Sequence, residues 1–395
     1  MDYKLSRRVN AIKPSPTLAV SQKAADLKAQ GKDVIGLGVG EPDFDTPEFI
    51  REAAKQAIDA GHTRYTAVDG IAELKQAVCD KFKRDNDLTY SPDQILISAG
   101  GKHSIFNLLT AWLDEGDEVI IPAPYWVSYP DMTLLVGAKP VVVQATIEQE
   151  YKITADQLRA AITPKTRMLF LNSPSNPTGM AYSKDELAAL AGVLREYPDI
   201  LIATDDMYEH ILWTDEPFAN IVMAAPDLQD RTVILSGVSK AYAMTGWRIG
   251  YAAGPKPLIA AMKKVQSQST SNPAAVSQHA ALAALQGDQG CIDTMVTEFK
   301  KRHDYLVEAL HAIPGIQCLP GQGTFYTFPN VTGLMRKAGC KTDVELCERL
   351  LEEESVALVP GSAFGTDGYF RLSFATSMDV LEEAVTRIRR FAESV

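Results

Sequence analysis

Short runs of apolar residues alternate with longer stretches of helical spacing between about residues 48 and 290. Each run is bounded by turn residues, as expected for strands that are buried on both faces of a mainly parallel sheet. The runs lie at residues 95–97, 118–121, 167–171, 200–203 and 232–235. Helical spacing is clearest just after the first run, in residues that share one helix face: Ile105, Leu108, Leu109 and Trp112. This alternation predicts a large α/β domain with a mainly parallel sheet between helices.

The pattern changes after about residue 300. A long helix (299–312) leads into shorter apolar strands, and a last helix covers about residues 378–392. The short strands are expected at residues 325–328, 356–359 and 370–374. Mixed short strands and helices of this kind predict a smaller α+β domain.

The N-terminal segment begins with a polar and basic arm of about 15 residues. Helical spacing follows over residues 15–30, and a short strand is expected at residues 34–37. We expect this segment to join the smaller domain. The predicted division is 1–47 for the arm and part of the small domain, 48–295 for the large domain and 296–395 for the small C-terminal domain.

Composition limits the classes of protein that fit this pattern. A chain of 395 residues with 46% apolar and 23% charged residues is typical of a globular protein with two domains. The formal net charge of −11 argues against nucleic-acid binding, which needs basic surface. Five scattered cysteines lack zinc spacing, and no segment has the roughly 20 apolar residues of a membrane span or the pattern of a signal peptide. We therefore expect a cytoplasmic protein with no metal site and no membrane partner.

Lys240 follows the apolar run at residues 232–235 and precedes a Gly-Trp-Arg segment that ends in Arg248. A lysine just after a buried strand can form an imine with an aldehyde cofactor, and an arginine near it can meet a cofactor phosphate. Burial or nearby positive charge would help such a lysine to lose its proton. The alternative is a surface lysine at the end of a strand.

Asp205 follows the run at residues 200–203, with Tyr208 close behind it. Ligands of open parallel sheets collect at the carboxyl ends of the strands. A carboxylate at that place can keep a pyridine nitrogen protonated, and a tyrosine beside it can hydrogen-bond a phenolic oxygen. The alternative is that Asp205 or Asp206 caps a following helix.

Two strand-to-helix loops carry further candidates. Residues 172–179 hold two Asn and two Pro, which force a rigid and non-helical loop. Asn176 in this loop could face the same phenolic oxygen, or the loop could serve only as a turn. In the turn at residues 98–104, Gly100 and Gly101 would let backbone N–H groups approach a phosphate at a helix N-terminus.

Three more residues stand out by their position. Lys102 could attract the distal carboxylate of a substrate, or it could simply be solvated. Trp126 follows a proline-rich loop and could stack on a ring or belong to the core. Arg371 lies inside an apolar strand, where a charge is costly unless it is paired with a carboxylate of the protein or of a ligand.

Several common motifs are absent from the sequence. The glycine-rich run at residues 36–40 lacks the GxGxxG spacing of dinucleotide sites and opens a Pro/Asp loop instead of a helix. P-loop, HExxH and GxSxG patterns do not occur. The candidates above must therefore be explained by another chemistry.

Taken together, these segments resemble one family over nearly the whole chain: the class I aminotransferases, which are pyridoxal-phosphate (PLP) enzymes of the aspartate aminotransferase family. The matching segments occur in the order and approximate spacing of the family, at residues 40–47, 172–179, 205–208, 239–250 and 371. Residues 100–102 and 125–130 resemble the bacterial aspartate aminotransferase branch.

The resemblance implies how the cofactor is held. Lys240 carries the PLP imine and moves protons. Asp205 pairs with the ring nitrogen, and Tyr208 and Asn176 bind the phenolic oxygen. Trp126 stacks on the ring.

The resemblance also implies a phosphate site, formed by Arg248 and the turn with Gly100, Gly101 and Lys102. Some family members carry a phosphate-binding serine at the position that Gly237 occupies in this chain. Ser236 or Ser239 could take over that contact.

Substrate binding follows from the same resemblance. Arg371 holds the α-carboxylate with help from the backbone at Gly40, and Lys102 meets the side-chain carboxylate of aspartate or glutamate. Trp126 and Asn176 also face the substrate.

Family members are usually homodimers with shared active sites. Tyr65 matches the tyrosine that reaches the phosphate of the other subunit, and Lys13 matches a segment near the substrate entrance. The resemblance therefore implies a homodimer that binds amino acids and 2-oxo acids.

The implied reaction is a ping-pong transamination between L-aspartate and 2-oxoglutarate, through a Lys240 Schiff base, that gives oxaloacetate and L-glutamate. Aromatic, alanine or prephenate specificity within the family stays open, as does a PLP C–S lyase. A non-catalytic ligand-binding regulator of the same fold is the remote alternative, although no helix-turn-helix segment is evident.

Overall fold

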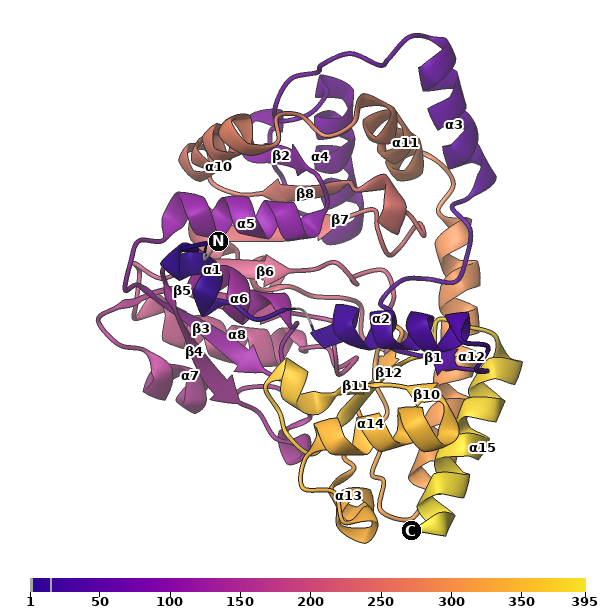
Figure 1. The fold of residues 1–395 in the computed structure, drawn as a ribbon. Coiled ribbons are helices and arrows are strands. Elements are labelled where there is room, and N and C mark those ends of the chain that lie inside the picture. The colour runs from indigo at the N-terminus through magenta and orange to yellow at the C-terminus, as the bar shows by residue number, and fades with distance from the viewer. Residues whose placement is uncertain (1–2, 15) are drawn as a thin grey trace.

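A seven-stranded sheet with helices on both sides forms the larger part of the molecule (Figure 1). The computed structural model describes residues 3–14 and 16–395. The strand order is β2-β8-β7-β6-β5-β3-β4; β8 is antiparallel to both neighbours, and the other pairs are parallel. The strands are β2 (Ile95–Ser98), β3 (Glu118–Ala123), β4 (Lys139–Gln144), β5 (Thr166–Asn172), β6 (Leu201–Asp205), β7 (Thr232–Gly237) and β8 (Gly250–Ala253).

Successive residues of each central strand belong to different core clusters, because side chains alternate between the two faces of a sheet. In β5, for example, Leu169 and Leu171 pack on one face, and Met168 and Phe170 pack on the other. The first face is covered by α4 (Ala72–Asn86), α7 (Ala155–Ala161), α8 (Lys184–Arg195), α9 (Ile221–Ala224) and α11 (Ala275–Gln286). The second face is covered by α5 (Gly101–Trp112), α6 (Ser128–Leu135) and α10 (Lys256–Ser269). Helix α3 (Glu48–Asp59) packs outside, on α11.

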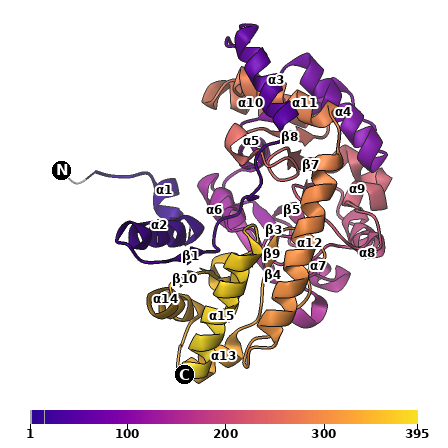
Figure 2. The ribbon, with the colours of Figure 1, turned by 90° about the vertical axis from the view of Figure 1, so that its right-hand side faces the viewer.

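The smaller part contains two short sheets, one strand pair and one antiparallel triplet. Strand β1 (Ile35–Gly36) pairs in parallel with β10 (Val356–Ala357). The triplet has the order β11-β12-β9, formed by β11 (Val359–Pro360), β12 (Phe370–Ser373) and β9 (Tyr326–Thr327). Its helices are α12 (Gly290–His311), α13 (Thr332–Ala338), α14 (Asp343–Glu354) and α15 (Met378–Ser394). A separate apolar cluster holds these elements together, and α12 runs along the side of both parts (Figure 2).

The N-terminal segment lies on the smaller part, as the sequence predicts. Helix α2 (Pro16–Ala29) packs on β1 and β10, with Ala24 in a small apolar cluster beside Ala357. Helix α1 (Arg7–Ala11) has no buried residue and contacts α6. Figure 2 shows both helices at one side of the body.

The α/β fold with a mainly parallel sheet is confirmed, and several boundaries differ from the prediction. The long helix begins at Gly290 rather than at residue 299, because Ile292 and Met295 continue its buried face. The predicted strand 356–359 divides into β10 and β11, which pair with different strands. The strand predicted at 34–37 is limited to β1, and the predicted helix start at Ser15 lies outside the described residues. The predicted division at residue 295 falls inside α12 and stays a prediction.

The strand register brings the polar candidates together. Asn172 at the end of β5 lies beside Asp205 at the end of β6, and Asp205 lies beside Leu235 near the end of β7. Lys240 follows β7 after a short turn. Within residues 3–14 and 16–395, no helix combines the length and the apolar composition needed to cross a membrane.

Candidate active site

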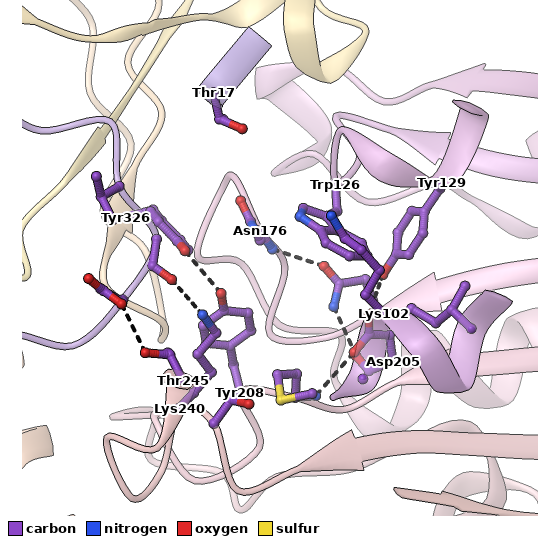
Figure 3. Close-up of a pocket in the computed structure, with 18 of the residues that line it drawn as sticks. Thr17, Lys102, Trp126, Tyr129, Asn176, Asp205, Tyr208, Lys240, Thr245 and Tyr326 are labelled. Atoms are coloured by element: carbon purple, nitrogen blue, oxygen red, sulfur yellow. Dashed lines mark hydrogen bonds between the residues drawn. The ribbon is translucent and has the colours of Figure 1, made fainter. Parts of the chain in front are cut away.

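A cavity of about 440 Å³ opens at the carboxyl ends of the central strands, where the larger and smaller parts meet. Most residues selected from the sequence line it: Gly40, Gly101, Lys102, Trp126, Asn176, Asp205, Tyr208, Ser239, Lys240, Arg248 and Arg371. Figure 3 shows many of these side chains pointing into one space from separate elements. Most residues selected from the sequence therefore lie together in the wall of one cavity.

Lys240 lies in the middle of this wall. Its Nζ donates a hydrogen bond to the Gly40 carbonyl and lies 5.9 Å from the centre of the Tyr208 ring (Figure 3). Burial, and then the Arg371 cation, lower the pKa of the Lys240 amine to about 8 from its ordinary value of 10.5. A neutral amine is therefore accessible near physiological pH, as a nucleophile or proton acceptor requires.

Asp205 ends β6 and is 7% exposed. Tyr129 of α6 donates a 2.6 Å hydrogen bond to its Oδ2. The Met207 N–H donates to Oδ1 at 3.3 Å. Burial raises the pKa of Asp205 to about 6, and these hydrogen bonds oppose the rise. The capping alternative is wrong, because the next helix, α9, is capped by Asn220 and not by an aspartate.

Arg371 is a buried cation without an acidic partner among the described residues. Its Nη1 donates to Asn176 Oδ1 at 2.9 Å, and its Nη2 donates to the Gly38 carbonyl at 2.6 Å. Arg371 is only 2% exposed, and its buried Nε has no hydrogen-bond partner among the described residues. The internal salt bridge that the sequence left open is therefore not formed, and the positive charge faces the cavity.

Tyr208 lies next to a residue that the sequence did not single out, Tyr326 of β9. The two hydroxyl oxygens are 3.0 Å apart (Figure 3). The Arg371 guanidinium lies over the face of the Tyr326 ring, and its carbon is 4.4 Å from the ring centre. Tyr208, Tyr326 and Arg371 thus form one buried group on the side of the smaller part.

The turn before α5 forms the other end of the cavity. Gly100 has a φ of +89°, and a Cβ at this position would overlap the Arg248 guanidinium. Arg248 Nη1 donates to the Thr245 carbonyl at 2.9 Å. Ser239 lines the cavity, whereas Ser236 points behind it toward Glu209, at 3.5 Å. Of the two serines, Ser239 is therefore the one in position to replace the serine that some family members carry where this chain has Gly237.

Lys102 and Trp126 meet at the mouth of the cavity. The Lys102 Nζ lies 4.9 Å from the centre of the Trp126 ring. Burial, and then Arg248, lower the pKa of Lys102 below its ordinary value. Trp126 is half-buried, with its ring in contact with Tyr129 edge to face at 5.4 Å.

Three predicted residues do not line the cavity. Gly100 lies just behind Gly101. Lys13 is exposed, and its backbone N–H donates to Asp131 at 3.3 Å. Tyr65 is 92% exposed. The roles implied for Lys13 and Tyr65 stay predictions.

Five lining residues that contact functional groups were missed: Glu41, Tyr129, Asn172, Thr245 and Tyr326. Tyr129 lies one helical turn after Trp126, which was the signal available for it. Asn172 accepts from the Asn176 N–H at 2.9 Å and donates to the Asp205 carbonyl at 2.9 Å, so it joins two strand ends. Tyr326 gave no signal beyond an aromatic strand.

A buried ionic group lies directly behind the cavity. Lys81 of α4 is fully buried and pairs with Glu209, which follows Tyr208 in the chain. Lys81 also donates to Asn86 Oδ1 at 2.8 Å. Burial raises the pKa of Glu209, but Lys81 and His210 outweigh burial, so that it lies below its usual value. The charge of Lys81 is therefore compensated by other residues of the protein.

A reactive amine, a carboxylate and a guanidinium around one cavity are typical of an enzyme that binds a carboxylate substrate. The sequence matches the family model of aminotransferase class I and II over residues 32–388. The chain belongs to this family, and it is an aminotransferase.

Individual relatives match nearly the whole chain. The aspartate/prephenate aminotransferase of Nitrosomonas europaea is 59% identical over 391 residues, which cover 98% of each chain. The solved aspartate aminotransferase from Rhizobium meliloti has a TM-score of 0.96 and 46% identity, and the match covers 99% of both chains. The aspartate aminotransferase from Thermus thermophilus with maleate has a TM-score of 0.92 and 43% identity, covering 99% of this chain and 100% of that one.

Proposed function

We propose that this chain is a PLP-dependent aspartate aminotransferase. It transfers the amino group of L-aspartate to 2-oxoglutarate in a ping-pong reaction and yields oxaloacetate and L-glutamate. The observation that carries this proposal is the meeting of Lys240, Asp205 and Arg371 in one cavity. The names of relatives such as the aspartate aminotransferase of Bacillus subtilis, 48% identical over 390 residues, support the choice of amino donor.

The residues of the cavity fit PLP. Gly100 has a φ of +89°, which favours glycine, and the two glycines leave the backbone of this turn open to a phosphate at the start of α5. Lys240 supplies an amine for the aldehyde, and Asp205 supplies a buried carboxylate for the ring nitrogen. When bound, PLP supplies an electron sink that stabilises negative charge on the substrate Cα.

The side chains around the cofactor divide the work. Lys240 would bind the aldehyde carbon of the cofactor, and its amine, once released, would move a proton away from the substrate Cα. Asp205 keeps a proton on the ring nitrogen, because the two opposite charges stabilise each other in a buried place. Tyr208 and Asn176 hydrogen-bond the phenolic oxygen, and Trp126 covers the ring.

The phosphate is held at the other end of the cavity. Arg248, Ser239 and the N–H groups at the start of α5 provide positive charge and donors. Tyr65 of the partner subunit adds a hydroxyl in the proposed homodimer. The 92% exposure of this aromatic side chain supports a second subunit that covers it.

Two cations select the substrate. Arg371, which lines the cavity, binds the α-carboxylate through its guanidinium, supported by backbone at Gly40, and Asn176 lines the same end of the cavity. Lys102 beside Trp126 meets the side-chain carboxylate of aspartate or glutamate. We also propose that Lys13 contributes to the entrance of this space and that the reaction takes place in the cytoplasm.

Prephenate is a second candidate substrate. Several relatives that are 51–59% identical carry the name aspartate/prephenate aminotransferase, with or without the word probable. Prephenate carries two carboxylates, which the same two cations would bind. No observation on the described residues favours a C–S lyase or a non-catalytic regulator.

The proposal is tested by a half-reaction on purified, PLP-loaded protein. One amino acid is added without an acceptor, and the visible absorption of the cofactor is followed. Aspartate and glutamate should convert the aldehyde form into the amine form far faster than alanine, phenylalanine or cystathionine. Lys240→Ala serves as the control and should show no conversion.

Reaction of neutral amino acids alone would contradict the proposed specificity. Release of ammonia and pyruvate from cystathionine would favour the lyase. A protein without a cofactor band would contradict the proposed function as a whole.

A further inference from the structure

Tyr326 occupies a position that none of the proposed roles explains. Tyr326 is only 1% exposed, yet its side chain lines the cavity from β9. Strand β9 pairs with β12, and Tyr326 lies opposite Ser373, two residues after Arg371. The antiparallel register therefore brings Tyr326 beside the cation of the neighbouring strand.

Two functional groups contact different parts of this one side chain. The Tyr326 hydroxyl lies 3.0 Å from the Tyr208 hydroxyl, and the ring face lies 4.4 Å from the Arg371 guanidinium carbon. The hydroxyl also approaches Gly40 so closely that a Cβ there would overlap it. The Gly40 carbonyl in turn accepts the hydrogen bond of Lys240. Tyr326 is thus the common neighbour of the tyrosine, the arginine and the glycine loop.

The geometry of the tyrosine pair allows either hydroxyl to donate to the other. If Tyr208 donates its proton to the phenolic oxygen of the cofactor, its oxygen is left to accept, and Tyr326 is the hydroxyl placed 3.0 Å away to donate to it. The proton of Tyr208 then remains free to be donated into the cavity, and the chain of two hydroxyls strengthens that second hydrogen bond.

We propose that Tyr326 is a positioning residue with two separable functions: its hydroxyl orients and strengthens Tyr208 as a donor to the cofactor, and its ring fixes the guanidinium plane of Arg371 for the substrate carboxylate. The proposal rests on the proposed function, because it assigns Tyr208 to the cofactor and Arg371 to the substrate. It adds one aromatic side chain that positions both Tyr208 toward the cofactor and Arg371 toward the substrate.

Two substitutions separate the functions. Tyr326→Phe removes the hydroxyl and keeps the ring, whereas Tyr326→Leu removes both. Tyr151→Phe is the matched control, because it deletes another buried hydroxyl, which donates to the Phe328 carbonyl outside the cavity wall. Thermal unfolding of each variant, compared with the control, identifies a loss of fold.

The first readout is the pH midpoint of the visible absorption band of the PLP-loaded protein. Fewer or weaker hydrogen bonds to the phenolic oxygen disfavour its anionic form, so Tyr326→Phe should raise this midpoint by about half a unit to one unit. Tyr326→Leu should raise it to a similar extent, and Tyr151→Phe should leave it unchanged. A midpoint that stays at the wild-type value in Tyr326→Phe, or that moves equally in the control, would overturn the hydroxyl function.

The second readout needs no cofactor. The affinity of the PLP-free protein for succinate, a dicarboxylate without an amino group, is measured by calorimetry. Tyr326→Leu should weaken succinate roughly 3- to 30-fold, because the cation–π contact that fixes Arg371 is lost. Tyr326→Phe should bind within about twofold of wild type, since its ring remains. Equal weakening by both substitutions, or by neither, would overturn the ring function.

The outcomes distinguish this inference from the proposed function. If wild-type protein shows no cofactor band, the function fails while the succinate comparison still tests the ring. If wild type transaminates aspartate and both readouts stay unchanged in the variants, the inference fails and the function stands.

Discussion

Lys81 and Arg371 are both fully buried cations, and the protein treats them in opposite ways. Lys81 lies behind the cavity and meets Glu209, Asn86 and, at 3.8 Å, Asp85. Arg371 lies in the cavity wall and donates its hydrogen bonds to neutral oxygen atoms of Asn176 and Gly38, and it has no acidic partner among the described residues.

The difference separates structure from function. A buried charge is costly unless a partner compensates it. At Lys81 the compensating partner is Glu209 of the same chain, so folding itself offsets the cost of burying the charge. At Arg371 the charge is only partly compensated, so a carboxylate ligand gains a strong and directional contact. An unpaired buried cation beside a reactive amine is therefore a better sign of a substrate site than burial of charge alone.

The largest effect is expected at Lys81. Lys81→Met leaves Glu209 buried without its cation and should lower the free energy of unfolding by about 3–5 kcal/mol. The double substitution Lys81→Met/Glu209→Gln removes both charges and should recover a large part of that loss. Chemical denaturation of the three proteins measures it. Equal destabilisation of the single and double variants would mean that the pair is not what stabilises this region.

Arg371→Met should have the reverse profile. The catalytic efficiency for aspartate should fall roughly 10²- to 10³-fold, because the α-carboxylate loses its partner. Stability should change little or rise, since an uncompensated buried charge is replaced by an apolar side chain. Steady-state kinetics and denaturation are measured on the same preparation. Destabilisation as large as that of Lys81→Met would contradict the comparison.

The pH dependence of Lys240, which is half-buried, extends the comparison to a third cation. Its pKa is lowered to about 8, so the amine is protonated below that pH and neutral above it. The rate at which the PLP-free protein attaches PLP should therefore rise with pH and level off above about 8. Arg371→Met removes a nearby positive charge and should move the midpoint upward. A wild-type midpoint near 10 would show that Lys240 behaves as an ordinary solvated lysine.

The smallest effect is expected at Lys102, which lies at the mouth of the cavity and is more exposed than Lys81, Arg371 or Lys240. Lys102→Ala should lower the catalytic efficiency for aspartate about 10-fold and for alanine less than about twofold, because an exposed ion pair contributes about 1 kcal/mol. Kinetics with both amino acids measure the ratio. An equal loss for the two substrates would remove the proposed role in selecting dicarboxylates.

Much of the fold could be predicted because the central strands are continuous apolar runs. The strands that were not predicted lack that signal. β4 begins with Lys139 and Pro140 at the edge of the sheet, and three of its six residues are exposed. β8 consists of Gly, Tyr and two Ala, and its place between β2 and β7 follows from long-range pairing alone.

The candidate site was predicted where a residue carries its own signal, such as a charge after an apolar strand or inside one. Lys240, Asp205 and Arg371 are of this kind. Tyr129 and Tyr326 are not, because their roles depend on partners far away in the chain: Asp205 for Tyr129 and Tyr208 for Tyr326. Only the folded register places those hydroxyls together.

The most direct test of the account is to locate the cofactor bond. The PLP-loaded protein is reduced with borohydride, digested and analysed by mass spectrometry. We expect the label on Lys240 and its loss in Lys240→Ala. A label on Lys102 or another lysine, or no label at all, would contradict the central claim that Lys240 is the amine that holds the cofactor.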